Sequence, residues 1–321
     1  MQEYGGYLPL EIGDGREYHQ FSEKDIRYYN CGRTAIYAAC GELSISEIYI
    51  PYYICQTVAD TIEALGIKVL RYHIDQNLEP IEDFPQSAAV LFVNYFGLQN
   101  HLMNTLAVRY KTAIIDNTQA FFCPPVMREK VSNIYSCRKF IGVPDGGYLI
   151  EKNCRAKQFP SGESWQYYTF ICKSRELGSN AAYQQNLENE RRLSEKEGMS
   201  ELTRQFLKGV DYARIIKARR SNYRELDHLL VEKNRLRLDL GGGVPYMYPY
   251  WAKDGSGEYI RAELIQRGIY VPTLWRECDS ICRPETLEYQ WSKDLIFLPV
   301  DQRYNEDDMC SLVKTILEIE G

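Results

Sequence analysis

The feature that most constrains the fold is an alternation of apolar runs and amphipathic segments between residues 47 and 115. The apolar runs have the length of strands, and the segments between them have helical spacing. The predicted strands are 47–50, 68–72, 88–94 and 113–115, and the predicted helices are 56–65 and, approximately, 102–110. Such alternation builds βαβ units. The sequence therefore predicts an α/β fold with a mostly parallel central sheet, whose ligands bind at the carboxyl ends of its strands.

A single lysine, Lys139, lies between two further strand-like runs, 131–136 and 146–150. The turn between them is rich in residues that allow tight bends, namely Gly142, Pro144, Asp145, Gly146 and Gly147. A lysine at the mouth of a sheet loses contact with water, which lowers its pKa and makes its neutral amine available as a nucleophile. The alternative is an ordinary loop lysine without a chemical role.

The segment 30–43, NCGRTAIYAACGEL, predicts an anion site at the start of a helix. Gly32, Arg33 and Thr34 precede small and apolar residues at helical spacing. Free backbone N–H groups, the positive end of the helix dipole, one hydroxyl and one cation together favour an anion. The alternative is a simple helix start that Thr34 caps.

Asp116 follows the predicted strand 113–115 directly, at the edge where parallel sheets bind their ligands. It either caps the next turn or has a chemical role. Combined with Lys139 and the anion site, it indicates pyridoxal phosphate: the phosphate at the helix start, the aldehyde in a Schiff base with Lys139, and the pyridine nitrogen held protonated by Asp116. NAD is disfavoured because no G-x-G-x-x-G follows a predicted strand.

In order along the chain, these motifs resemble those of the DegT/DnrJ/StrS family, the sugar-nucleotide aminotransferases among the fold-type I pyridoxal phosphate enzymes. The resemblance runs nearly end to end. The matching segments are GRTA at 32–35, IPYYICQTV at 50–58, NYFG at 94–97, Asp116 with Gln119 and Ala120, Ser136 with Lys139, Gly146 and Gly147, the helix and Gly-Ile of 261–269, and FLP at 297–299.

The resemblance implies a large domain with a mostly parallel sheet and a small C-terminal α/β domain. It also implies a homodimeric aminotransferase that takes its amino group from a small-molecule donor and passes it to a keto-sugar or sugar-nucleotide, in saccharide or secondary metabolite biosynthesis. Two alternatives stay open: a non-catalytic or regulatory dimeric relative, and a related dehydratase. The family's dehydratases replace the lysine with histidine, so Lys139 opposes the second alternative.

The resemblance also assigns roles to residues. Lys139 and Asp116 are the implied catalytic residues, and Gln119 is expected beside the cofactor ring and its phenolic oxygen. The implied phosphate ligands are Gly32, Arg33, Thr34 and Ser136. The residue that stacks on the ring is Cys55, Tyr52 or Tyr53, and Asn180 of a partner subunit is a further candidate ligand.

Composition narrows the classes of partner. The 321 residues carry a net charge of −6, with a pI near 5.5, which disfavours nucleic acid. Ten scattered cysteines, and a first stretch without a basic start or an apolar core, fit a reducing cytoplasm. Only Cys278 and Cys282 are closely spaced, and the four histidines form no cluster, so no metal site is predicted. No apolar run is long enough to span a membrane.

We expect three parts: an N-terminal arm at 1–29, a large cofactor-binding domain at 30–215 and a small domain at 216–321. The arm has no sustained period. Helices are predicted across 181–230, broken near Gly198 and with Ser200 as a cap. The small domain is predicted to contain an extended run at 245–251, a helix at 258–266 closed by Gly268, strands at 269–271 and 295–298, and an amphipathic helix at 305–319.

Overall fold

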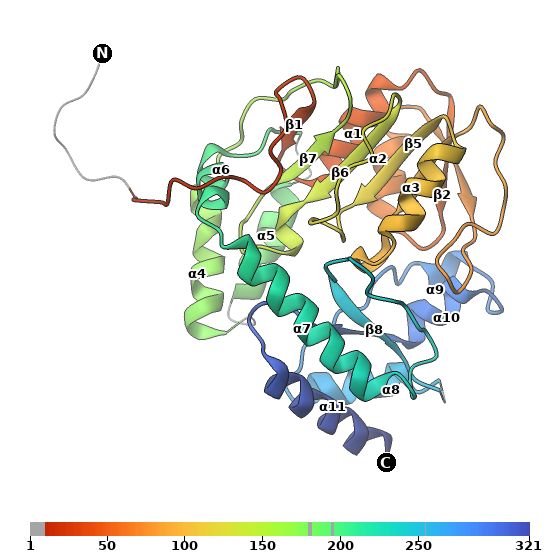
Figure 1. The fold of residues 1–321 in the computed structure, drawn as a ribbon, viewed down its shortest axis with the longest axis vertical. Helices are drawn as coiled ribbons and strands as arrows, with labels where there is room; N and C mark the ends of the chain where they lie inside the picture. Colours follow the sequence, from red (N-terminus) through yellow and green to blue (C-terminus); the bar gives the residue numbers. More distant parts are fainter. Residues whose placement is uncertain (1–9, 179–181, 194–195, 254) are drawn as a thin grey trace.

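The computed structural model describes residues 10–178, 182–193, 196–253 and 255–321. Figure 1 shows a central sheet with helices on both faces, and a smaller layer below it that the last third of the chain forms. The helices of the first part are α1 (Gly32–Glu42), α2 (Gln56–Glu63), α3 (Asn100–Arg109), α4 (Tyr168–Leu177), α5 (Tyr183–Arg192) and α6 (Glu201–Lys208). The predicted α/β architecture is confirmed.

In the described part of the chain the central sheet has seven strands, in the order β1-β7-β6-β5-β4-β2-β3. They are β1 (Ile26–Tyr29), β2 (Glu47–Pro51), β3 (Lys68–Tyr72), β4 (Ala89–Val93), β5 (Thr112–Asn117), β6 (Val131–Ser136) and β7 (Gly147–Ile150). The five strands from β3 to β6 in this order are parallel, and β7 and β1 run antiparallel to their neighbours. The parallel strands therefore end at one edge, as the βαβ pattern predicts.

The inner strands form because both of their faces are covered. Every residue of β4 and β6 is buried. β6 includes polar residues, and the amide of Asn133 is satisfied by hydrogen bonds to the backbone of Val126 and the carbonyl of Ile150. A buried polar group with its bonds made costs little. β6, the strand that precedes Lys139, is consequently fixed inside the sheet.

Two expectations about secondary structure differ from the structure. Residues 26–29 of the predicted arm form β1, which pairs with β7 at the end of the sheet. Conversely, the predicted strand 269–271 has no ladder partner among the described residues, because the chain turns at Gly268 (φ 79°) and the amide of Ile269 donates to the carbonyl of Leu264. Ile269 therefore closes helix α8 (Gly257–Gln266).

The part of the described chain from α7 onward, which we call the C-terminal domain, consists of helices around a two-stranded antiparallel sheet. Its remaining elements are α7 (Tyr212–Leu230), β8 (Met247–Trp251), α9 (Cys278–Ile281), α10 (Leu287–Asp294), β9 (Leu295–Pro299) and α11 (Glu306–Glu320). The long helices α7 and α11 pack together on one side (Figure 1). The expected boundary at 215/216 falls inside α7, and the division into domains stays a prediction. Across the described residues, none of the helices combines the length and apolarity needed to cross a bilayer.

Candidate active site

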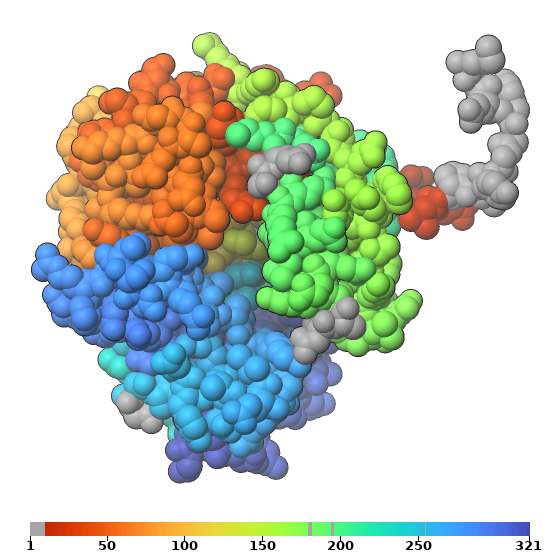
Figure 2. Space-filling view, turned by 180° about the vertical axis from the view of Figure 1, so that it is seen from behind, coloured from red at the N-terminus to blue at the C-terminus, as the bar shows by residue number. Residues whose placement is uncertain are grey.

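A cavity of about 240 Å³ lies where β5 and β6 end and α1 begins. Figure 2 shows the molecule hollowed between the red and orange first third of the chain, the green α4–α5 region and the blue C-terminal domain. Six of the seven predicted cofactor residues line the cavity, and further wall residues come from α2, α5 and a C-terminal loop. The predicted residues in the wall are Gly32, Arg33, Asp116, Gln119, Ser136 and Lys139.

Lys139 ends the short 3-10 helix η2 (Cys137–Lys139) that follows β6 directly. Its Nζ donates a hydrogen bond to Thr118 Oγ1 at 3.0 Å and lies 5.9 Å from the centre of the Tyr246 ring. Lys139 as a whole residue is exposed, because the cavity opens to solvent. Its amine, however, is surrounded by protein, and this burial of the amine lowers the pKa of Lys139. The carboxylate of Asp116 opposes the shift. The amine is thus more readily neutral than that of a surface lysine.

Asp116 is buried on β5, one residue before the strand ends. Its Oδ1 accepts a hydrogen bond from the backbone N–H of Thr118 at 2.8 Å. Because the hydroxyl of Thr118 also accepts from Lys139, this threonine joins the carboxylate to the amine. A carboxylate and a partly desolvated amine are therefore held in one cavity, as the sequence predicts.

The start of α1 approaches the sheet closely. A Cβ at Gly32 would lie 2.8 Å from the methyl carbon of Thr118, and one at Gly147 would lie 2.4 Å from the carbonyl carbon of Cys31. Only glycine permits this approach. The first turn of α1 consequently presents its N–H groups beside Ser136, whose Cβ lies 3.9 Å from the same position at Gly32.

Thr34 points elsewhere. Its hydroxyl donates to Asn30 Oδ1 at 2.7 Å, and the residue lines a neighbouring hollow together with Tyr37 and Lys196. Arg33 lines both hollows. A phosphate in the cavity would therefore meet the backbone of this turn and the Arg33 side chain more directly than the Thr34 hydroxyl. The role of Thr34 stays a prediction.

An ion cluster in the cavity wall was not predicted. Arg138, adjacent to Lys139, forms an ion pair with Glu190 of α5, and Arg33 lies 3.9 Å from the same carboxylate. The Nε of Arg138 donates to the carbonyl of Pro144 at 2.9 Å, which fixes the direction of its guanidinium. Adjacency to Lys139 is the only signal in the sequence that could have drawn attention to Arg138.

The aromatic wall also differs from the expectation. Among the candidates to stack on a ring, Cys55 lines the cavity, whereas Tyr53 is buried against Trp275 and Tyr52 stacks on His73. Trp275 itself lines the cavity and has a positive φ of 50°. It belongs to a loop of the C-terminal domain, and nothing in the sequence pattern singles it out.

Two further predictions concern Gln119 and Asn180. Gln119 is buried, and its Oε1 accepts from the backbone N–H of Phe96 at 3.0 Å, so part of its polar capacity holds the neighbouring loop. Asn180 lies outside the described residues.

Within the described residues no group of histidine, cysteine or acidic side chains could hold a metal ion.

The turn after Lys139 is anchored by a buried carboxylate. Asp145 accepts hydrogen bonds from the backbone N–H of Ser200 at 2.7 Å, from the Ser200 hydroxyl at 2.9 Å and from the hydroxyl of Thr203. Ser200 caps α6, as predicted. The turn of residues 140–147 is therefore tied to the start of a helix, which restricts the segment that carries Lys139.

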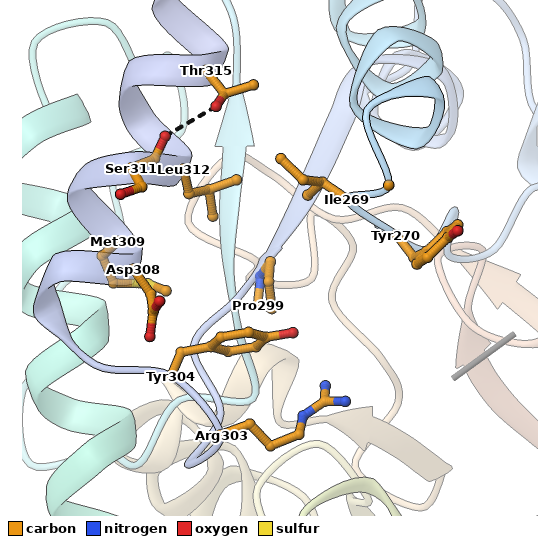
Figure 3. A pocket seen from close by; sticks show the side chains of 11 residues that line it. Ile269, Tyr270, Pro299, Arg303, Tyr304, Asp308, Met309, Ser311, Leu312 and Thr315 are labelled. Carbon is orange, nitrogen blue, oxygen red and sulfur yellow. Dashed lines mark hydrogen bonds between the residues drawn. The ribbon is translucent and has the colours of Figure 1, made fainter. Parts of the chain in front are cut away.

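A second pocket, of about 360 Å³, lies in the C-terminal domain between the end of α8, β9 and α11. Figure 3 shows its apolar side chains beside the ring of Tyr304 and the guanidinium of Arg303. Its lining includes none of the predicted site residues. Arg303 pairs with Asp301, so its charge is balanced within its own loop. Most of the predicted site residues line the cavity at the start of α1 instead.

Comparison with known proteins shows where this architecture occurs. No protein-family model and no curated protein matches the chain. Solved structures do: the aminotransferase TlmJ from Streptoalloteichus hindustanus (16% identity, TM-score 0.64, 92% of this chain and 86% of that chain) and a DegT DnrJ EryC1 StrS aminotransferase from Brucella abortus (13%, 0.58, 92% and 86%). The PLP-form of the putative sugar aminotransferase Spr1654 from Streptococcus pneumoniae is also similar (11%, 0.64, 92% and 86%).

At these identities the likeness establishes the fold. The chain has the α/β fold of these aminotransferases over about nine-tenths of its length. The predicted α/β architecture with a mostly parallel central sheet is thereby confirmed.

Proposed function

We propose that the protein is a pyridoxal-phosphate-dependent aminotransferase that acts on a keto-sugar or sugar-nucleotide. The observation that carries the proposal is that Lys139 and Asp116 meet, through Thr118, in a cavity at the start of α1. The fold supports it, since the structurally similar proteins are aminotransferases, and one of them is a putative sugar aminotransferase solved in a PLP-form.

The residues present fit this cofactor. Its phosphate needs N–H donors and positive charge, which the glycine-permitted first turn of α1, Ser136 and Arg33 supply. Its aldehyde needs a neutral amine, and burial lowers the pKa of Lys139. Its ring nitrogen needs a carboxylate, and Asp116 is buried in the same wall. When bound, the cofactor supplies the electron sink that transamination requires.

Each residue then has a task. Lys139 would hold the cofactor covalently until the amino donor displaces it, after which its Nζ would take the proton from the donor's α-carbon and deliver it to the cofactor. Asp116 would keep a proton on the ring nitrogen. Thr118, which accepts from Lys139 and donates its backbone N–H to Asp116, would orient both groups. Trp275 would cover the cavity from the C-terminal domain and exclude water.

The substrates can be tested by a two-stage measurement. Protein loaded with the cofactor is mixed with an amino donor such as glutamate, and loss of its visible absorption reports the first half-reaction. A panel of keto-sugars and nucleotide-linked keto-sugars is then added, and return of the absorption identifies the acceptor. If the donor discharges the cofactor and simple 2-keto acids alone restore it, the sugar part of the proposal is wrong. If no donor discharges it, the non-catalytic alternative is favoured.

We further propose that the protein is a homodimer. α4 has no buried residue along its length, and the α4–α5 region exposes large apolar side chains: Trp165 (66%), Leu177 (69%) and Tyr183 (56%). A helix with this surface needs a partner. A second copy would cover this surface beside the cavity, to whose wall α5 contributes Glu190.

All ten cysteines are free, which supports a reducing cytoplasm as the compartment.

A further inference from the structure

Two polar residues of the C-terminal domain contact the segment that carries Lys139. Gln302, in the loop after β9, donates from Nε2 to the carbonyl oxygen of Phe140 at 2.8 Å. Arg219 of α7 donates from Nε to Gln302 Oε1 at 3.2 Å, and its guanidinium lies 4.5 Å from the centre of the Phe140 ring. Because Phe140 directly follows Lys139, Gln302 holds the backbone next to the lysine, and Arg219 holds Gln302 and the Phe140 ring.

The same arginine also reaches the other side of the lysine. Its Nη1 donates to the carbonyl oxygens of Pro245 and Tyr246, each at 3.1 Å. The ring of Tyr246 lies 5.9 Å from Lys139 Nζ, and its backbone N–H donates to the carbonyl of Phe96 at 2.7 Å. Arg219 therefore connects the backbone after Lys139 with the aromatic ring that faces its amine.

Burial of the Arg219 guanidinium in this place costs free energy. It is almost fully buried, and among the described residues it forms no ion pair. Burial lowers the pKa of its guanidinium to about 10, against the attraction of Asp301. A buried cation is tolerated where hydrogen-bond acceptors surround it, as three do here, and an apolar residue would fill the same space at lower cost. Its hydrogen bonds and its stacking on Phe140 therefore account for its presence.

We propose that Arg219 and Gln302 are positioning residues, which hold the Lys139 amine in the cavity from the C-terminal domain. The inference rests on the proposed function for the role of Lys139. It goes further in assigning the orientation of that lysine to contacts across the junction between the domains. Docking of the C-terminal domain then places Lys139 and closes the cavity with Trp275 at the same time.

The test is made first on the cofactor-free protein. The reactivity of Lys139 toward an acylating reagent is measured by mass spectrometry as a function of pH, which gives the pH midpoint of its amine. Gln302→Ala removes the bond to Phe140, so the amine reaches solvent more freely and its midpoint moves upward, toward that of an ordinary lysine. Gln266→Ala, an exposed glutamine at the end of α8, is the control and leaves the midpoint unchanged.

Two further variants test the bond to Phe140 and the guanidinium of Arg219 one at a time. Gln302→Glu keeps an acceptor for Arg219 but loses the donor to Phe140, so it behaves like the alanine variant. Arg219→Lys keeps the positive charge but loses the planar guanidinium with its several N–H donors. It also moves the pH midpoint of the Lys139 amine upward. In the loaded protein, Gln302→Ala also slows covalent attachment of pyridoxal phosphate to Lys139 by about 2- to 10-fold, the effect of one hydrogen bond.

Two results separate this inference from the proposed function. If Gln302→Ala lowers the melting temperature but leaves the midpoint of Lys139 unchanged, the contacts are merely structural and the inference is overturned. If the wild-type protein takes up no cofactor while the midpoint still moves in the variants, the positioning contacts hold and the proposed function fails.

Discussion

Lys139 and Asp116 carry different parts of the proposed chemistry, and substitution separates them. Lys139→Ala removes the amine but leaves Gly32, Arg33 and Ser136 in place. We expect this variant to lose transamination and covalent attachment completely, while it still binds pyridoxal phosphate non-covalently. Equilibrium dialysis with the cofactor, together with the half-reaction with glutamate, measures both properties. Loss of all cofactor binding would show that the phosphate contacts are wrongly placed.

Asp116→Asn tests whether Asp116 holds a proton on the ring nitrogen of the cofactor. The amide preserves the shape of the side chain but cannot hold a proton on that nitrogen. The covalent bond to Lys139 should still form, whereas the half-reaction with glutamate should slow by about 10² to 10³, or about 3 to 4 kcal/mol. Single-turnover absorbance measures the rate. Turnover near that of the wild type would reduce Asp116 to a cap for the Thr118 turn.

His19 gives the fold a specific acid sensitivity. It is buried among the rings of Phe121, Tyr135 and Tyr148, and this burial lowers its pKa to about 3. The unfolded chain binds a proton at this residue below about pH 6.5, whereas the folded chain does not until about pH 3. Its contribution to stability is therefore lost as the pH falls from 6.5, by about 1.4 kcal/mol per pH unit.

His19→Phe should flatten this dependence. The comparison is urea denaturation of both proteins between pH 4 and 7, where the carboxylates contribute equally to the two curves. Equal slopes would mean that His19 is accessible to protons in the folded state.

Among single residues, the sequence predicts those that lie in a recognisable local pattern. Lys139 and Asp116 follow apolar strands, and Gly32 precedes a helix, so each could be placed from its neighbours. Trp275, Arg138 and Glu190 could not. Trp275 and Glu190 reach the cavity from segments that are distant in sequence, and only the packing of α5 and the C-terminal domain brings them there.

Among the elements, the turn after β6 and the start of α6 depend on one another. Asp145 accepts three hydrogen bonds from Ser200 and Thr203 in a fully buried setting. Asp145→Ala leaves these donors without partners, which should lower the free energy of unfolding by about 2 to 4 kcal/mol. Urea denaturation measures the loss, with the exposed Glu163→Ala as a control. A change below about 0.5 kcal/mol would show that water replaces the carboxylate.

Elements with a strong period could be predicted, and those defined by pairing could not. The strands β2 to β6 and the helix α11 agree with the predicted ranges to within a few residues, because their apolar spacing is regular. β1 was missed because its four residues, IRYY, follow a polar stretch, and only the ladder to β7 makes them a strand. The predicted strand at 269–271 failed for the opposite reason, since its composition suits a strand but no strand of the described chain pairs with it.

For the whole molecule, the exposed face of α4 predicts a dimer. Leu177→Glu places a charge on this face and should convert the dimer to a monomer, because burial of an unpaired carboxylate is costly. Val108→Glu, at a similarly exposed apolar position on α3, should leave the dimer intact. Sedimentation with the cofactor present measures both. A wild-type protein that sediments as a monomer would contradict the shared interface.

The central claim is that the cavity binds pyridoxal phosphate through Lys139. The most direct measurement is to add the cofactor to the purified protein, record the visible absorption, reduce with borohydride and map the modified residue by mass spectrometry. We predict a visible absorption band and, after reduction, a single modified lysine at position 139. A protein that takes up no cofactor at micromolar concentration, or one modified at other lysines in its place, would contradict the account.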